Sequence, residues 1–267
     1  TPNPRVVRVL SGITPSYTAL PAIASPAGST NGAGTVLTAT NGSWSFQPTT
    51  AQLVMYQQRR LPTTDDLRGW SEQLAGVGYT RLRTTAVTGL AVPLLESMGF
   101  SVIQELVLLE HTDPAAGSRA ARTPHAAVTT RRLLVAERPR ASAIDQAAFG
   151  RDWALDDVAV HDVCTATPRH RARAAEQPGA DRPTGYAITG RGSGQGFLQR
   201  LATDPDVAGN GIGTALVLDA LQWAARRRCG RLLVNTQREN HRALALYEHL
   251  GFVATTTDLV VLSRPVP

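Results

Sequence analysis

One pattern of residues occurs twice in this chain, and the repeat limits the folds that the chain can adopt. Residues 78–109 and 230–262 each indicate a strand, a loop, a short amphipathic helix ended by glycine, and a second strand. The helix ends at Gly99 in the first copy and at Gly251 in the second, and phenylalanine follows both. These glycines are 152 residues apart, and the same offset aligns a glycine at the start of each copy. The repeat predicts two copies of one α/β unit.

The stretch between the copies has the composition of a linker. Residues 113–130 are small, polar and proline-containing, without apolar periodicity. Because 267 residues also exceed the usual size of one domain, we predict a first half at 1–112, a linker, and a second domain at 131–267. Residues 1–34 show one strand-like stretch, Arg5 to Leu10, and are otherwise unassigned.

Arginine alone carries the positive charge of the chain. All 27 basic residues are Arg, and the net charge is +6. A basic balance suits a polyanionic ligand, but no basic stripe is interleaved with aromatic residues, so nucleic acid is not an expected partner. No apolar run approaches the roughly 20 residues of a membrane span, and no signal-peptide pattern is present, so we expect a cytoplasmic protein. Cys164 and Cys229 lack metal-ligand spacing, and we expect no metal site.

The second copy is preceded by further elements with local sequence signals. They are a strand at 133–137, helices at 141–149 and 154–167, a hairpin of strands at 183–189 and 196–203, and a long helix at 214–228. The turn before the long helix, residues 208–213, reads Ala-Gly-Asn-Gly-Ile-Gly. Glycines let the backbone approach a ligand, and free N–H groups at a helix start favour a pyrophosphate. Taken alone, this signal is weak, because glycine-rich turns between a strand and a helix are common and can be purely structural.

The turn and the helix of the second copy together resemble the GNAT acetyltransferase family. Residues 240–252 match the family element Asn-x-x-Ala-x-x-Leu-Tyr-x-x-x-Gly-Phe at every position, and Gly211 and Gly213 match the glycines of the family loop. Ala208 replaces the Arg or Gln of the family, so we expect weaker loop anchoring through a backbone N–H that is still available. The resemblance covers residues 131–262. It implies an α/β fold with a mixed, mostly antiparallel central sheet flanked by helices.

The same resemblance implies an acetyl-CoA-dependent N-acetyltransferase with acetyl-CoA as co-substrate and an amine as acceptor. Tyr247 would protonate the leaving thiolate, since a phenol of pKa about 10 and a thiol of pKa about 8.5 allow this transfer. The alternative is a half-buried aromatic residue that packs on the sheet. The backbone of residues 201–203 would bind the pantetheine arm and polarise the thioester carbonyl. The cofactor-binding residues implied are Leu201, Ala202, Thr203, Ala208, Gly209, Asn210, Gly211, Ile212, Gly213, Thr214, Asn240 and Ala243.

The first copy lacks these residues. At the same offset Tyr247 corresponds to Leu95 and Asn240 to Thr88, and the glycines of the turn correspond to side-chain-bearing residues at 57–61. We therefore predict a degenerate GNAT-like first half without a cofactor site, in tandem with a catalytic second domain. This layout resembles that of mycothiol synthase.

The acceptor side is less well defined by sequence. Phe149 and Trp153 resemble the aromatic element beside the acceptor cleft of ribosomal-protein N-terminal alanine acetyltransferases, although two core aromatic residues would look the same. That family often has a glutamate base five residues before the loop Asn, where this chain has Asn235. The remaining candidate bases are Asp162, His161, Glu176 and His241, or a chain of water molecules.

Three functions remain open from the sequence. The first is acetylation of a peptide or protein amino terminus by direct attack in a ternary complex. The second is acetylation of a small amine, as in mycothiol synthase. The third is a non-catalytic sensor of acetyl-CoA, which the intact Tyr247 disfavours. The oligomeric state is not indicated.

Overall fold

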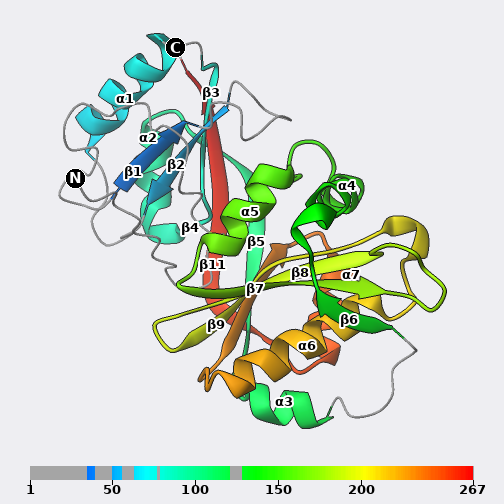
Figure 1. Cartoon of the computed structure of the whole chain (residues 1–267). Helices are drawn as coiled ribbons and strands as arrows, with labels where there is room; N and C mark the ends of the chain where they lie inside the picture. Colours follow the sequence, from blue (N-terminus) through cyan, green and yellow to red (C-terminus); the bar gives the residue numbers. More distant parts are fainter. Residues whose placement is uncertain (1–34, 40–49, 56–62, 77–78, 121–127, 267) are drawn as a thin grey trace, which may run out of the picture. The chain divides into compact units, whose positions relative to one another are not determined.

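The computed structural model forms two compact units (Figure 1). It describes residues 35–39, 50–55, 63–76, 79–120 and 128–266, so the predicted strand at 5–10 and the first-copy positions 57–61 lie outside the described residues. Unit 1 comprises residues 1–108, 235–239 and 255–267, and unit 2 comprises residues 109–234 and 240–254. The end of the chain thus belongs to unit 1, unlike the predicted segment 131–267, because the last strand pairs with strands of the first half.

In the residues that the structure describes, unit 1 contains a group of paired strands and two α-helices. Its strands are β1 (Thr35–Ala39), β2 (Thr50–Met55), β3 (Arg81–Thr84), β4 (Val87–Thr88), most of β5 (Ser101–His111), and the ends of β10 (Leu232–Gln237) and β11 (Val253–Pro265). Its helices are α1 (Thr64–Gly76) and α2 (Val92–Ser97). β2 pairs with β1 in antiparallel and with β3 in parallel orientation. Both β3 and β4 pair antiparallel with β11. These last pairings explain why residues 255–267 belong to unit 1.

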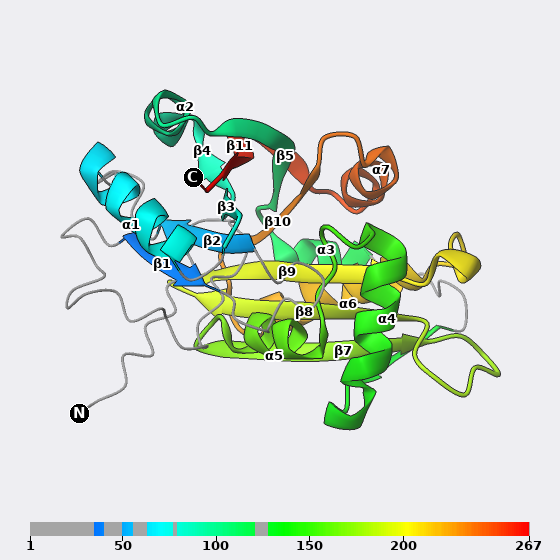
Figure 2. The same ribbon diagram turned by 90° about the horizontal axis from the view of Figure 1, so that it is seen from above.

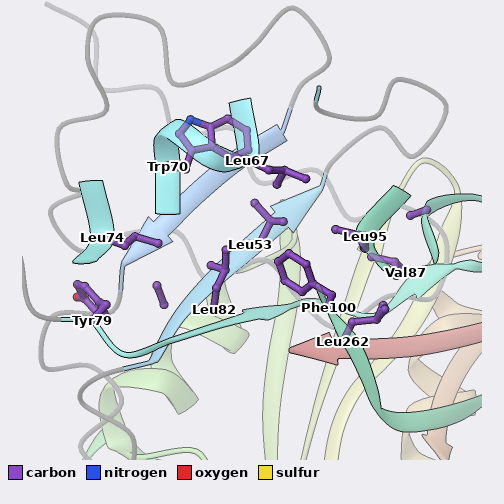
Figure 3. Close-up of a cluster of buried hydrophobic side chains, with 12 residues drawn as sticks. Leu53, Leu67, Trp70, Leu74, Tyr79, Leu82, Val87, Leu95, Phe100 and Leu262 are labelled. Carbon is purple, nitrogen blue, oxygen red and sulfur yellow. The ribbon is translucent and has the colours of Figure 1, made fainter. Parts of the chain in front are cut away.

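The core of unit 1 lies between α1 and its sheet. Leu67, Trp70 and Leu74 share one face of α1 because they recur at helical spacing, and all three are buried. Figure 3 shows them beside Leu53 of β2 and Leu82 of β3. Unit 1 therefore has a hydrophobic core of its own, to which Leu262 of β11 also contributes.

Unit 2 contains the larger sheet. Its elements are α3 (Pro114–Ala120), β6 (Thr129–Arg132), α4 (Arg138–Phe149), α5 (Asp157–Thr165), β7 (Arg169–Glu176), β8 (Gly185–Gly192), β9 (Gln195–Thr203), α6 (Ile212–Arg226), the start of β10 (Leu232–Gln237) and α7 (His241–His249). The strands follow the order β6-β7-β8-β9-β10, and only the β9–β10 pair is parallel. The predicted mixed, mostly antiparallel sheet flanked by helices is confirmed.

Helices cover both faces of this sheet. Neighbouring residues of a strand point to opposite faces. On β8, Tyr186 donates a hydrogen bond to Asp145 of α4, whereas a Cβ at Gly185 would lie 2.6 Å from Ile212 of α6. Helices α4 and α6 therefore lie on opposite faces, and Figure 2 shows α4 and α5 in front of the strands and α6 behind them.

The repeated helix end has the same geometry in both copies. Gly99 has φ +81° and Gly251 has φ +84°, in the left-handed region that favours glycine. The N–H of the phenylalanine that follows donates to the carbonyl of Leu95 in the first copy and of Tyr247 in the second, at 3.0 Å in each case. This is the hydrogen-bond pattern of a glycine-terminated helix, and it confirms the predicted helix ends.

Two local predictions upstream of the second copy were wrong. The predicted linker contains helix α3, which begins where the side chain of Asp113 accepts a hydrogen bond from the N–H of Ala116 at 2.9 Å. Helix α3 packs against α6, a tertiary contact that its small-residue composition does not reveal. Residues 133–137 do not form a strand: β6 ends at Arg132, and Val135–Glu137 is a 3-10 helix that leads into α4.

Strand β7 was missed because arginine interrupts its apolar pattern. It reads Arg-His-Arg-Ala-Arg-Ala-Ala-Glu. Arg171 and Arg173 pair with Asp219 of α6, at 3.2 and 2.6 Å. A part-buried acid on the facing helix therefore pairs with the charged residues on the inner face of this strand, and periodicity in β7 alone does not indicate such a partner.

No helix in the described part of the chain is long and apolar enough to cross a membrane.

Candidate functional site

Strand β9 offers backbone groups beyond the end of a parallel ladder. In unit 2, β10 pairs with β9 at two positions, Leu232 with Gly196 and Leu233 with Phe197. On its other edge β9 remains paired with β8 as far as Thr203. The predicted pantetheine-binding residues, 201–203, thus follow the last described β9–β10 pair by several positions. A polar chain running beside β9 can pair with groups of this kind.

A β-bulge lies just before these residues. In the β8–β9 register Ile188 faces Arg200 and Thr189 faces Leu198, so Gln199 is the extra residue. A bulge increases the local twist and re-aims the side chains next to it. The bulge directs Arg200 toward α4, on the face opposite to α6.

The glycine turn has the backbone conformations that its sequence suggested. Gly209 has φ +94° and Gly211 has φ +77°. Gly211 is the N-cap of α6, so the first N–H groups of the helix follow directly. A Cβ at Gly209 would meet no atom within 4 Å. The open turn and the helix start together form an arrangement that suits a phosphate group.

Two details of this turn differ from the predictions. A Cβ at Gly213 would lie 3.1 Å from Cδ2 of Leu246, so this glycine lets α6 approach α7 closely. The N–H of Ala208 donates to the carbonyl of Pro205 at 3.2 Å, so it is not available to a ligand as expected. The short 3-10 helix before Ala208 was not predicted, and it is this helix that takes up the N–H group.

An ion pair anchors the start of the turn. Arg140 of α4 donates to Asp204 at 2.5 Å and to the carbonyl of Pro183 at 3.0 Å. Burial is the largest single influence and raises the pKa of Asp204, but the hydrogen bonds to this carboxylate and the charges of nearby arginines, Arg140 first, together outweigh burial, and the pKa is lowered. Asp204 also accepts a hydrogen bond from the N–H of Asp206. This anchor lies four residues before the position where the family has Arg or Gln.

Asn240 has a structural task at the start of α7. Its Oδ1 accepts a hydrogen bond from the N–H of Ala243 at 3.1 Å and thereby caps the helix. The amide nitrogen of Asn240 remains the part of the side chain suited to donate to a ligand. The backbone N–H of Ala243 is occupied by the cap, so Ala243 does not offer it to a cofactor.

Tyr247 lies on α7 with its ring inside the unit. It is 5% exposed, and its ring packs at a tilt against Phe252, with centroids 5.6 Å apart. Burial raises the pKa of Tyr247, and the charge of Arg200 opposes part of this rise. No hydrogen bond joins the hydroxyl to another described residue. The phenol therefore stays protonated at neutral pH, but it is a weaker acid than the unperturbed phenol assumed from sequence.

A buried polar network that the sequence reasoning missed lies beneath α4. Asp145 is 0% exposed and accepts four hydrogen bonds. The donors are Nε and Nη2 of Arg200 at 2.8 and 2.6 Å, the hydroxyl of Tyr186 at 2.5 Å and the N–H of Leu155 at 2.7 Å. Burial, and next the charge of Asp145, raise the pKa of Tyr186, which remains a neutral donor. The sequence held one signal for this network: Asp145 lies beside Ile144 on the inner side of the predicted helix, where an acid needs partners.

The two aromatic residues predicted for the acceptor side lie at this network. The guanidinium carbon of Arg200 is 3.7 Å from the ring centroid of Phe149. Nη2 of Arg200 also donates to the carbonyl of Trp153 at 2.8 Å. Both aromatic residues are partly exposed, so they are not a fully buried core pair. The structure thus brings Phe149 and Trp153 together through Arg200.

The candidate bases are not gathered at one place by the structure. Glu176 is taken up by an ion pair with Arg131, which also binds Glu137. His161 on α5 and His241 on α7 are exposed, and the side chain of Asp162 lies outside the described residues. Asn235 belongs to unit 1. The base therefore stays unassigned.

Neither cysteine is suited to nucleophilic chemistry. Burial raises the pKa of Cys164 to about 11 and also raises the pKa of Cys229. A thiol of this kind carries little thiolate at neutral pH. Among the described residues no group of three or more His, Cys, Asp or Glu side chains is placed to hold a metal ion.

Comparison with known proteins finds a family match over part of the chain. Residues 140–252 match the Acetyltransferase (GNAT) family. A mycothiol acetyltransferase of Kineococcus radiotolerans is 30% identical over 211 residues, covering 73% of this chain and 65% of that protein. Human N-alpha-acetyltransferase 30 is 41% identical over 59 residues, covering 22% of this chain and 16% of that protein.

A solved structure shares this fold over most of the chain. A tandem GNAT protein from the clavulanic acid biosynthesis pathway superposes with a TM-score of 0.60 at 15% identity, over 82% of this chain and 76% of that chain. The chain spans just under two thirds of the length of the Kineococcus relative and a smaller share of the human one.

Proposed function

We propose that this chain carries an N-acetyltransferase domain of the GNAT family and that unit 2 transfers the acetyl group of acetyl-CoA directly to a primary amine. The observation that carries the proposal is the contact between α6 and α7 at Gly213 and Leu246. It joins the helix start suited to a pyrophosphate to the helix that bears Tyr247. A cofactor lying between them would place its phosphates at one helix and its sulfur near the other.

Acetyl-CoA fits the groups that these elements present. The N–H groups after Gly211 and the helix dipole favour the pyrophosphate. The edge of β9 at residues 201–203 suits the amides of the pantetheine arm, and the amide nitrogen of Asn240 can donate to the same arm. Thr214, Asn210 and Ile212 belong to this cradle as the residues that flank its glycines. The side chain of Ile212 is buried, so its contribution is its backbone N–H.

The reaction follows from the chemistry of these groups. The amine nitrogen attacks the thioester carbonyl carbon, a C–N bond forms, and an N–H of β9 stabilises the charge that develops on oxygen. The C–S bond then breaks, and the thiolate takes the proton of Tyr247. The proton lost by the attacking nitrogen leaves through water or a base and restores the phenol. Because burial raises the pKa of Tyr247, proton transfer and C–S cleavage are coupled in this scheme.

A peptide or protein amino terminus is the acceptor that we propose, and a small amine is the second candidate. The short, high-identity match to an N-alpha-acetyltransferase supports the first. The longer match to a mycothiol acetyltransferase supports the second, together with the tandem layout. In both cases we propose that the first half, residues 1–112, holds no cofactor, since Leu95 and Thr88 replace Tyr247 and Asn240.

A screen of acceptors tests the function. Short peptides, amino acids, aminoglycosides and cysteinyl sugars are each mixed with the protein and acetyl-CoA, and release of the free thiol of CoA is measured. Release with peptides supports the first candidate, and release with cysteinyl sugars alone supports the second. Tight binding of acetyl-CoA without release for any amine would contradict an enzyme and favour a sensor.

A further inference from the structure

We propose that Arg200 is a positioning residue that holds the acceptor side of the site against the reacting thioester. Here the acceptor wall means the ring of Phe149 and the backbone carbonyl of Trp153. The inference rests on the proposed function, because it assumes that an amine binds beside this wall. Arg200 itself is not assigned any contact with the amine or with acetyl-CoA.

One side chain makes all the contacts that this role needs. Arg200 stacks on Phe149 at the end of α4, donates to the carbonyl of Trp153 in the connection after α4, and binds Asp145 within α4. Its own backbone directly precedes Leu201, the start of the segment proposed to bind the thioester. Arg200 therefore ties the α4 end to β9 at the point where the carbonyl would be polarised.

The rest of the network makes this tie rigid. Asp145 receives both Nε and Nη2 of Arg200, and this two-point contact fixes the plane of the guanidinium. The hydroxyl of Tyr186, from β8, holds the second side of the carboxylate, and the N–H of Leu155 binds it from the chain beyond Trp153. Two strands and one loop thus donate hydrogen bonds to a single buried carboxylate of α4.

Arginine is required here because three functions depend on its shape. A planar guanidinium can stack on a ring, bind a carboxylate at two points and donate to a carbonyl at the same time. A lysine keeps the charge opposite Asp145 but supplies neither the stack nor the fixed fork. Replacement by lysine therefore loosens the acceptor wall without leaving a buried carboxylate unpaired.

The test compares Arg200→Lys with Arg173→Lys. Arg173 makes a similar part-buried pair with Asp219 on the opposite face of the same sheet, away from the acceptor wall. We expect Arg200→Lys to raise the KM for the amine about tenfold or more, since small displacements of a bound reactant are costly. The dissociation constant for acetyl-CoA should stay within about twofold of wild type. Arg173→Lys should leave both constants unchanged.

A second variant keeps the test valid if Arg200→Lys folds poorly. Tyr186→Phe removes one hydrogen bond to Asp145, keeps the ring, and touches no proposed ligand. We expect a smaller rise in the amine KM, again with acetyl-CoA affinity unchanged. A merely structural network would lower thermal stability in both variants while leaving the amine KM of the folded fraction as in wild type. That result would overturn the proposal.

Failure of the proposed function is seen separately. The wild-type protein is measured first, and its inability to release CoA with any amine rejects the function itself. Where the wild type turns over, an unchanged amine KM in both Arg200→Lys and Tyr186→Phe rejects only the role of Arg200.

Discussion

Replacing Tyr247 with phenylalanine separates the chemistry of this residue from its packing. The ring is 5% exposed and lies against Phe252, and Phe retains both features. The hydroxyl has no hydrogen-bond partner among the described residues, so the variant leaves no polar group of the protein unpaired. We therefore expect folding and acetyl-CoA affinity to remain close to wild type.

The chemical step should slow by about 10²–10⁴-fold if the phenol protonates the leaving thiolate. This corresponds to roughly 2.7–5.4 kcal/mol of activation free energy. The structure also predicts the pH dependence. Because burial raises the pKa of Tyr247, the acid remains protonated above the pH at which an ordinary phenol ionises, and loss of this proton should not reduce the rate below about pH 10.

Single-turnover measurements at saturating acetyl-CoA provide the assay, because slow product release would hide a defect in the chemical step. Leu95→Ala, at the equivalent position of the first copy, is the control. Leu95 is fully buried, so this change should cost about 2–5 kcal/mol of stability while leaving the chemical step alone. Full single-turnover activity of Tyr247→Phe would refute the acid role. A loss near tenfold would show that water protonates the thiolate and that Tyr247 mainly positions the sulfur.

Two further predictions concern the binding of acetyl-CoA. Gly211→Val should raise its dissociation constant sharply, because a β-branched residue disfavours φ +77° and narrows the turn. Gly179→Val is a matched control, since Gly179 has the same φ and open space around it. Thermal unfolding of both variants separates the effect of backbone strain from the loss of binding. Equal acetyl-CoA affinity in the two variants would show that the phosphates do not bind at this turn. Gly213→Val should instead act through Leu246, lowering stability and the rate, because its Cβ would meet that side chain. Finally, calorimetry should give one acetyl-CoA site per chain, and two equivalent sites would contradict a first half without cofactor.

The sequence alone determined the features that depend on local backbone chemistry. The two glycine-terminated helices were predicted because a left-handed residue at a helix end favours glycine wherever the helix lies in the fold. The turn before α6 was predicted for the same reason, since Gly209 and Gly211 both have positive φ. Tyr247 was identified because it belongs to a continuous element, residues 240–252, whose spacing can be recognised without knowledge of any distant segment.

Tertiary structure alone decided the features that depend on distant partners. Arg200 and Asp145 are 55 residues apart, and the sequence did not indicate that they interact. The packing of α4 on β9 brings them together, and Arg200 then also contacts Phe149 and Trp153. The sequence predicted a free N–H at Ala208, but in the structure this group donates to the carbonyl of Pro205 in a 3-10 helix. Strand β11 begins within the second copy of the repeat but pairs with β3 and β4 of the first half. Burial and strand pairing join segments that lie far apart along the chain. A local sequence pattern does not indicate which distant segment will pack against it.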